Sequence, residues 1–115
     1  VRHTYVGGWH LPGGGVELGQ TIEEALAREC EEEANIKLTG APVLKSMHFN
    51  RAATPRDHIG FFLVEDFVQT APKLPDREIA EARFFALSDL PADTTVGTHQ
   101  RIAEALGGAA PSPYW

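Results

Sequence analysis

The chain has 115 residues, 43% of them hydrophobic, and a formal net charge of −6. This length suits one domain with a single core, so we expect one domain over residues 1–115. The acidic charge excludes non-specific binding to nucleic acid through phosphate contacts, and no apolar run approaches the roughly 18 residues of a membrane span.

The N-terminal part is predicted to be extended and rich in glycine. Val1 to Val6 has the composition of the end of a strand, and we expect the strand or strands that lead into it to lie outside this sequence. A turn follows at Gly7-Gly8, and Pro12 restricts the residue before it to extended geometry. The three glycines at 13–15 can take positive φ and approach a ligand closely.

A helix is predicted over residues 22–34. Thr21 and Glu24 have the spacing of a capping box, and Asn35 suits the left-handed residue that ends a helix. The single cysteine, Cys30, excludes an internal disulfide, and we interpret it as a core residue. Because no signal peptide is seen in the sequence, we expect a cytoplasmic location. One face of the helix is apolar and is expected to be buried; it comprises Ile22, Ala25, Leu26, Cys30 and Ala34.

The opposite face of this helix carries clustered carboxylates. Glu29, Glu32 and Glu33 have the spacing i, i+3, i+4, so they project from successive turns and repel one another. Arg28 can pair with Glu32 one turn later and relieve part of the repulsion. A hard divalent cation such as Mg²⁺ would explain the cluster, because it prefers oxygen ligands. A solvated acidic face is the alternative that the helix alone leaves open.

The middle of the chain predicts two strands joined by a polar loop. Residues 43–49 alternate as a half-buried strand does, and residues 58–64 form the most apolar run, typical of a central strand. Gly60 within that run indicates a bulge or a close backbone approach. The loop 50–57 carries Arg51 and Arg56, and arginine suits bidentate contact with phosphate.

The C-terminal part predicts a strand, a helix and a tail. Residues 82–87 are the strand candidate, and a helix is expected from about Thr98, with Gly107 at its end. Residues 107–115 are interpreted as a tail whose aromatic end could dock on the domain or on another subunit. The apolar face of the helix is expected to comprise Ile102, Ala103 and Leu106.

The combination of the glycine loop and the acidic helix resembles the Nudix hydrolase family. Its signature runs Gly, five residues, Glu, seven residues, Arg-Glu-apolar-x-Glu-Glu-x-Gly-apolar. Gly14 takes the first place, residues 28–33 give the Arg-Glu-apolar-x-Glu-Glu core, and Ile36 closes the motif. Gln20 stands where the family has its first Glu, and Asn35 stands where it has its last Gly. The first departure removes a charge beside the expected metal site.

The resemblance implies a fold and an activity. The fold would be an α/β/α sandwich with a mixed β-sheet, and the activity would be hydrolysis of a pyrophosphate bond by attack of water at phosphorus. The substrate would be a small nucleoside diphosphate linked to another moiety, and the cofactor Mg²⁺ or Mn²⁺. Arg28 would orient the carboxylates, and Glu32 should be the most sensitive position. The metal ligands would be the side chains of Glu29, Glu32 and Glu33 and the carbonyl oxygen of Gly13.

Several family members use one more acidic residue from a loop beyond the signature. Glu78 is the leading candidate, with Glu81 as runner-up, and a solvated loop carboxylate is the alternative for either. Arg51 and Arg56 are the candidates for the substrate phosphates, although both could be ordinary surface arginines.

Two other functions stay open from the sequence. One is a module that kept the fold and binds nucleotides without turnover because of Gln20; the other is an acidic domain that binds cations or a basic partner. The intact carboxylate core favours the hydrolase, since binding alone would not need it. A homodimer remains open as the state of assembly.

Overall fold

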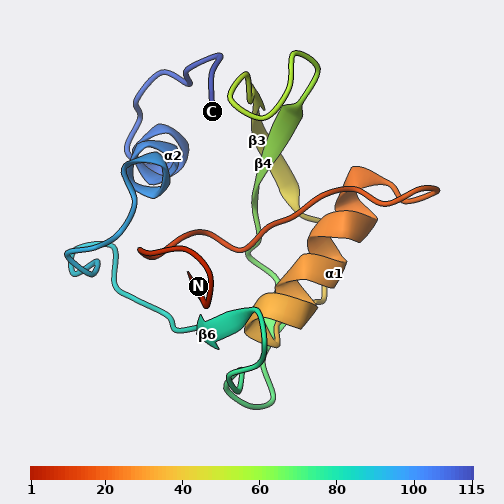
Figure 1. Cartoon of the computed structure of the whole chain (residues 1–115), viewed down its shortest axis with the longest axis vertical. Coiled ribbons are helices and arrows are strands. Elements are labelled where there is room, and N and C mark those ends of the chain that lie inside the picture. The colour runs from red at the N-terminus through yellow and green to blue at the C-terminus, as the bar shows by residue number, and fades with distance from the viewer.

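The computed structural model describes all 115 residues, and the two helices lie on opposite sides of the strands (Figure 1). This arrangement agrees with the α/β fold class and the helix, strand, helix layering expected from the sequence. The elements, in chain order, are β1 (Arg2–His3), α1 (Ile22–Ala34), β2 (Lys37–Leu38), β3 (Val43–Phe49), β4 (His58–Leu63), β5 (Phe67–Val68), β6 (Ile79–Glu81) and α2 (Val96–Leu106).

The strands pair as three antiparallel two-stranded sheets. β1 pairs with β6, β2 with β5, and β3 with β4. Parallel pairing occurs at two isolated bridges, Trp9 with Thr94 and Phe49 with Tyr114. Between the named strands all pairing is antiparallel, so the mixed character expected of the sheet is limited to these two bridges. The pairing of β1 with β6 brings together two segments that lie far apart in the sequence. It also places the N-terminal segment beside α1.

Helix α1 has the predicted bounds and both predicted caps. The Thr21 hydroxyl accepts from the Glu24 N–H, Glu24 accepts from the Thr21 N–H, and Asn35 is left-handed with φ 52°. Ala25, Cys30 and Ala34 are buried, whereas Ile22 is exposed. Gly60 of β4 permits a close approach, as its position suggested, because a Cβ there would lie 2.8 Å from Ile22 Cδ1.

The strand predicted over residues 82–87 is wrong. The strand in this region is β6, which ends at Glu81, and its Ile79 is the most buried apolar side chain at 1% exposure. The aromatic residues that suggested a strand pack individually instead. Phe84 stacks on Phe67, and Phe85 meets Trp9 edge to face. Two short strands, β2 and β5, were not predicted.

Helix α2 begins earlier than predicted and buries a different face. Thr95, not Thr98, is its N-cap, and Gly107 ends it as expected. The buried residues are Thr98 and Arg101, while Ala103 and Leu106 are exposed, so the predicted apolar face is wrong in part. Arg101 is only 2% exposed because His48, Glu104 and the Tyr114 carbonyl surround its guanidinium.

The C-terminal residues pack on the domain. The Phe49 N–H donates to the Pro113 carbonyl at 2.7 Å, and the Trp115 N–H donates to the Phe49 carbonyl at 3.0 Å. The segment 112–115 thus lies along the edge of β3, and Figure 1 shows this end of the chain beside α2 and the β3–β4 hairpin. Neither helix has the length and apolar character needed to cross a membrane.

Candidate active site

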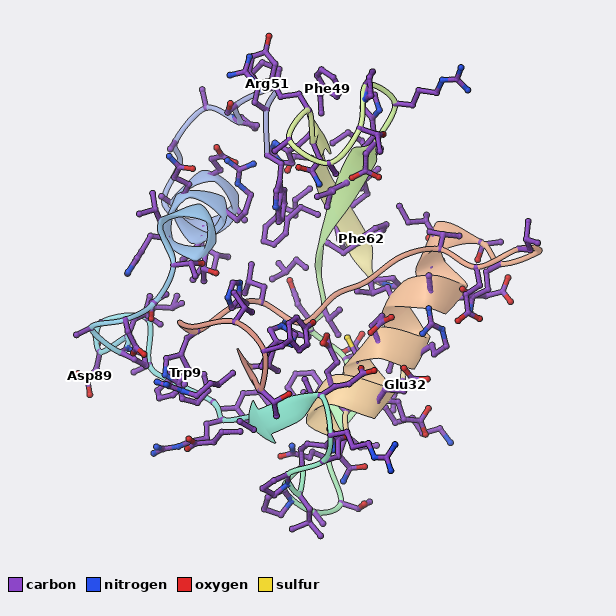
Figure 2. The ribbon with its side chains drawn as sticks, viewed as in Figure 1. Trp9, Glu32, Phe49, Arg51, Phe62 and Asp89 are labelled. Carbon is purple, nitrogen blue, oxygen red and sulfur yellow. The ribbon has the colours of Figure 1, made fainter.

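Helix α1 carries the three candidate carboxylates in three different environments. The Glu32 side chain is 60% exposed and lies on the outer surface of α1 (Figure 2). The Glu29 side chain is 14% exposed, and that of Glu33 only 9%. The sequence placed all three on one face, but Glu33 turns toward the buried side of the helix, next to Cys30 and Ala34. The carboxylates therefore follow the edge between core and solvent.

Arg28 links the outer carboxylates to the glycine loop. Its Nη1 lies 2.9 Å from Glu29 Oε1 and 3.3 Å from Glu32 Oε2, and Nη2 donates to the Gly15 carbonyl at 3.0 Å. The predicted pairing of Arg28 with Glu32 is confirmed. Glu17 lies 3.8 Å from the same guanidinium nitrogen. One cation thus orients two helix carboxylates and ties the loop to α1.

The glycine loop closes directly onto the helix carboxylates. The Gly13 N–H donates to Glu33 Oε1 at 2.7 Å. A Cβ at Gly14 would lie 2.6 Å from Glu29 Cδ, closer than real Cβ contacts come, whereas a Cβ at Gly15 would meet nothing within 4 Å. Gly14 therefore has to be glycine for Glu29 to hold its position. The contact gives a physical reason for glycine at position 14 of this chain.

Gln20, the departure from the family signature, takes part in the same loop. Its Oε1 accepts the Glu17 N–H at 3.0 Å, and its own N–H donates to the Glu17 carbonyl at 3.0 Å. The side chain thus closes the turn 17–20. An amide carbonyl accepts this hydrogen bond as a carboxylate oxygen would, so the exchange of Glu for Gln preserves the loop.

Glu33 is a buried carboxylate beside other acidic groups. Burial raises its pKa to about 7 and the charges of Glu29 and Glu78 add to the shift, whereas the Gly13 N–H and the N-terminal ammonium oppose it. The only basic side chain within ion-pair distance is His3, with Nδ1 4.0 Å from Glu33 Oε2. Glu78 therefore acts on Glu33, whereas Glu81 lies 3.4 Å from Arg83. This environment favours Glu78 over Glu81 as the additional acidic residue.

The carboxylates of α1 offer the oxygen atoms that a hard divalent cation binds, but their side chains are not arranged around one point. No three His, Cys, Asp or Glu side chains converge closely enough to hold a metal ion as they stand. Arg28 occupies one oxygen each of Glu29 and Glu32, while Glu33 faces inward. Carboxylate oxygens are nevertheless the donor atoms that Mg²⁺ and Mn²⁺ prefer.

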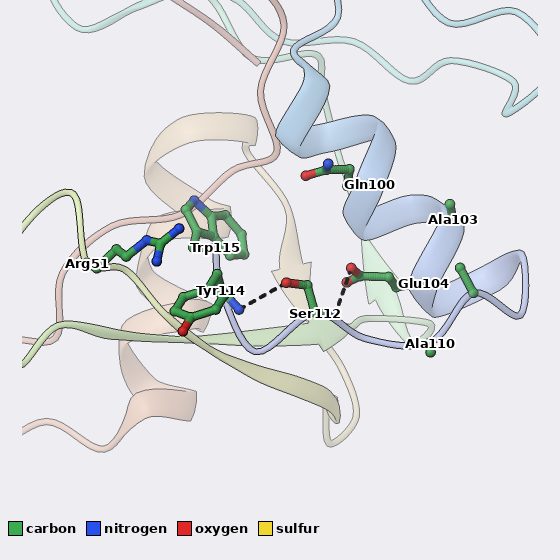
Figure 3. A pocket seen from close by; sticks show the side chains of 9 residues that line it. Arg51, Gln100, Ala103, Glu104, Ala110, Ser112, Tyr114 and Trp115 are labelled. Atoms are coloured by element: carbon green, nitrogen blue, oxygen red, sulfur yellow. Dashed lines mark hydrogen bonds between the residues drawn. The ribbon is translucent and has the colours of Figure 1, made fainter.

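The predicted phosphate-binding arginines lie away from these carboxylates. Arg51 is at the tip of the β3–β4 hairpin, far from Glu32 in Figure 2, and its guanidinium lies 4.1 Å from the centre of the Tyr114 ring. It lines an open cavity of about 430 Å³ between α2 and the C-terminal segment (Figure 3). Arg56 is exposed in the same loop. The structure therefore does not bring either arginine to α1.

His3 is a neighbour of the site that the sequence did not single out. Strand β1 places it opposite Ile79, one residue after Glu78, and this pairing sets it beside Glu33. The position of His3 beside Glu33 depends on the long-range pairing of β1 with β6. A lone histidine near the start of the sequence gives no local signal for it.

Comparison with known proteins gives matches over most of the chain. The family model described as NUDIX domain matches residues 1–106. The ADP-ribose pyrophosphatase of Methanocaldococcus jannaschii is 36% identical over 94 residues, which cover 78% of this chain and 53% of that protein. The NAD-capped RNA hydrolase NudC of Vibrio vulnificus is 34% identical over 93 residues, covering 81% of this chain and 33% of that protein.

A third relative matches over a shorter stretch. The nucleoside triphosphatase NudI of Escherichia coli (strain SE11) is 54% identical over 37 residues, which cover 32% of this chain and 26% of that protein. The chain spans about half the length of the first relative and a third of the second.

Proposed function

Because the chain belongs to the Nudix family, we propose that it is a metal-dependent pyrophosphohydrolase acting on a small nucleoside diphosphate linked to another moiety. The observation that carries the proposal is the closure of the glycine loop onto Glu29 and Glu33 of α1. ADP-ribose and the NAD cap of RNA, named in two relatives, are the first substrates to consider. Both contain a diphosphate between two larger groups.

In the proposed reaction, water attacks one phosphorus, the bond from that phosphorus to the bridging oxygen breaks, and the other phosphate leaves with that oxygen. When bound, Mg²⁺ or Mn²⁺ supplies neutralisation of the phosphate charge and a more acidic water. Glu29, Glu32, Glu33 and the Gly13 carbonyl are the proposed ligands, and Arg28 fixes the orientation of Glu29 and Glu32. Glu78 is the proposed acceptor of the proton that the attacking water loses.

The contacts of Gln20 favour the hydrolase over a binding module without turnover. The inactive module was considered because Gln20 removes a charge, but this side chain closes its own loop and points its oxygen at the Glu17 N–H. The chain also keeps Glu29, Glu32 and Glu33 on α1, with Arg28 paired to Glu29 and Glu32. A protein that only bound nucleotides would have no need of this set.

The test is product analysis by anion-exchange chromatography. The full chain is incubated with Mg²⁺ or Mn²⁺ and a panel of diphosphate compounds that includes ADP-ribose, NAD and nucleoside triphosphates. We expect Glu32→Gln to lower kcat by two orders of magnitude or more while the circular dichroism spectrum stays unchanged. Glu31→Gln is the matched control, because Glu31 is exposed on the same helix and outside the cluster.

The outcomes separate the functions. Turnover in the wild type and in Glu31→Gln, but not in Glu32→Gln, supports the hydrolase. Binding of a panel compound without cleavage under either metal would favour the binding module instead. Equal turnover in both variants would remove Glu32 from the mechanism.

A further inference from the structure

The cavity between α2 and the C-terminal segment is lined by an arginine that the chain leaves without a carboxylate partner. Its volume of about 430 Å³ lies within the range of about 300–1,000 Å³ that is typical of small-molecule sites (Figure 3). Four other arginines of the chain pair with a carboxylate. Arg51 pairs with none, and its guanidinium lies 4.1 Å from the centre of the Tyr114 ring. Its N–H groups are therefore available to an anionic ligand.

Two aromatic rings give the same cavity a surface on which a planar ligand can stack. Tyr114 and Trp115 both line it, and they remain 43% and 46% exposed. Figure 3 shows the Trp115 ring between the side chains of Arg51 and Gln100. Exposed aromatic rings beside a cation are the arrangement with which proteins bind nucleobases and the phosphates attached to them.

The charges around the cavity favour an anion. Glu104 is the acidic side chain among the lining residues, and its Oε1 is held by two donors. Arg101 Nη2 lies 3.1 Å from this oxygen, and the Ser112 N–H donates to it at 3.1 Å. Among the lining side chains this leaves Arg51 as the unpaired charge. A guanidinium suits bidentate contact with phosphate.

We propose that this cavity is a second ligand site that binds a nucleoside monophosphate, with the base on Trp115 and Tyr114 and the phosphate on Arg51. The choice of ligand rests on the proposed function, because hydrolysis between the two phosphates leaves one of them on the nucleoside. Arg51 and Glu32 lie on well separated parts of the molecule (Figure 2). A cleavage product therefore binds here without occupying the carboxylates of α1.

The test is titration of the full chain with AMP, followed by tryptophan fluorescence, in EDTA so that no metal holds the nucleotide at α1. The chain has two tryptophans, and Trp9 is only 7% exposed, so saturable quenching reports on Trp115. Arg51→Gln should weaken AMP binding about tenfold or more, as expected for loss of a charge-assisted hydrogen bond. Its affinity for adenosine, which has no phosphate, should stay within about twofold of the wild type.

Arg56→Gln is the matched control, because Arg56 is exposed in the same loop but does not line the cavity. This variant should bind AMP as the wild type does. Trp115→Ala removes both the stacking surface and the fluorescent reporter, so its affinity is measured by calorimetry. We expect it to weaken AMP and adenosine alike, since both present a base.

The outcomes separate this inference from the proposed function. Absence of saturable quenching by AMP in the wild type would overturn the second site and leave the hydrolase intact. Equal weakening in Arg51→Gln and Arg56→Gln would overturn it too, because the charge of the loop and not the cavity would then hold the phosphate. Binding lost in Glu32→Gln but kept in Arg51→Gln would place the nucleotide at α1 instead. Failure of the hydrolase shows separately, as absence of cleavage in the product analysis.

Discussion

The position of the Glu29 side chain depends on the absence of a side chain at Gly14. A Cβ at this position would lie 2.6 Å from Glu29 Cδ, and Glu29 is also held by Arg28 at 2.9 Å. We therefore predict that Gly14→Ala displaces the Glu29 carboxylate and lowers kcat about 10- to 100-fold, the usual effect of disturbing a group that orients metal ligands. Steady-state kinetics on the diphosphate substrate measures it.

Gly15→Ala is the control for this prediction. A Cβ there meets nothing within 4 Å, and the carbonyl that accepts from Arg28 is part of the backbone. Its kcat should stay within about twofold of the wild type. Equal losses in the two variants would mean that the loop responds to lower flexibility rather than to the contact with Glu29.

Cys30 illustrates a residue whose chemistry is suppressed by its position. Burial raises the pKa of its thiol to about 11, and the charges of Glu33 and Glu29 add to the shift. Since the thiolate is the reactive form, we predict that a disulfide reagent at pH 8 modifies the folded chain at least 100-fold more slowly than the chain in guanidinium chloride. Absorbance of the released thiol gives both rates. Similar rates would place Cys30 at the surface.

At the scale of elements, α1 could be predicted because its signals are local. Thr21, Glu24 and Asn35 lie within one turn of its ends and fix both bounds without help from the rest of the chain. The carboxylate cluster follows from the same helical spacing. Its division into exposed Glu32 and buried Glu33 does not, because that depends on which side of α1 the strand β6 and the N-terminal segment cover.

Elements defined by distant contacts were predicted less well. The strand near residue 80 was placed too late because Phe84 and Phe85 look like strand residues, whereas the β1 pairing selects Ile79. The burial of Arg101 could not be foreseen, since its partners come from β3 and the C-terminal segment. The position of His3 beside Glu33 was not predicted for the same reason.

The loop before β6 is held by Asp76. Its carboxylate accepts from Lys73 Nζ at 2.7 Å and from the N–H groups of Ile79 and Glu78 at 2.7 and 2.9 Å. The Lys73 contact, followed by these two N–H groups, lowers the pKa of Asp76 to about 2. This loop sets the position of Glu78, so its stability bears on the proposed catalytic group.

The lowered pKa predicts how Asp76 contributes to stability at acid pH. Between its ordinary value of 3.8 and about 2, the unfolded chain binds more protons than the folded chain, so stability rises with pH. The contribution should be complete above about pH 4 and lost as pH falls toward 2. The difference in unfolding free energy between wild type and Asp76→Asn, from urea titrations, should follow this course. A difference that does not change with pH would contradict it.

For the whole molecule, the C-terminal segment completes a buried ionic group. Arg101 Nη2 lies 3.1 Å from Glu104 Oε1, Nη1 donates to the Tyr114 carbonyl at 3.1 Å, and the Ser112 N–H donates to the same Glu104 oxygen at 3.1 Å. The Trp115 ring covers the guanidinium at 5.1 Å. Figure 3 shows Glu104 on α2 facing Ser112, with Tyr114 and Trp115 at the chain end. The segment therefore adds a carbonyl, an N–H and an aromatic ring to an ion pair that α2 already makes.

We predict that removing residues 112–115 destabilises the domain by about 3–5 kcal/mol, because Arg101 loses the Tyr114 carbonyl and Glu104 loses the Ser112 N–H, and a hydrogen bond to a charged group contributes roughly 1.5–3 kcal/mol. For a domain of this size the loss corresponds to a fall in Tm of roughly 10 °C or more, measured by calorimetry. The same truncation in Arg101→Met should cost much less, because the neutral side chain needs no polar cover. Equal losses in the two backgrounds would mean that the segment stabilises the domain by packing and strand pairing at Phe49, and not by covering Arg101.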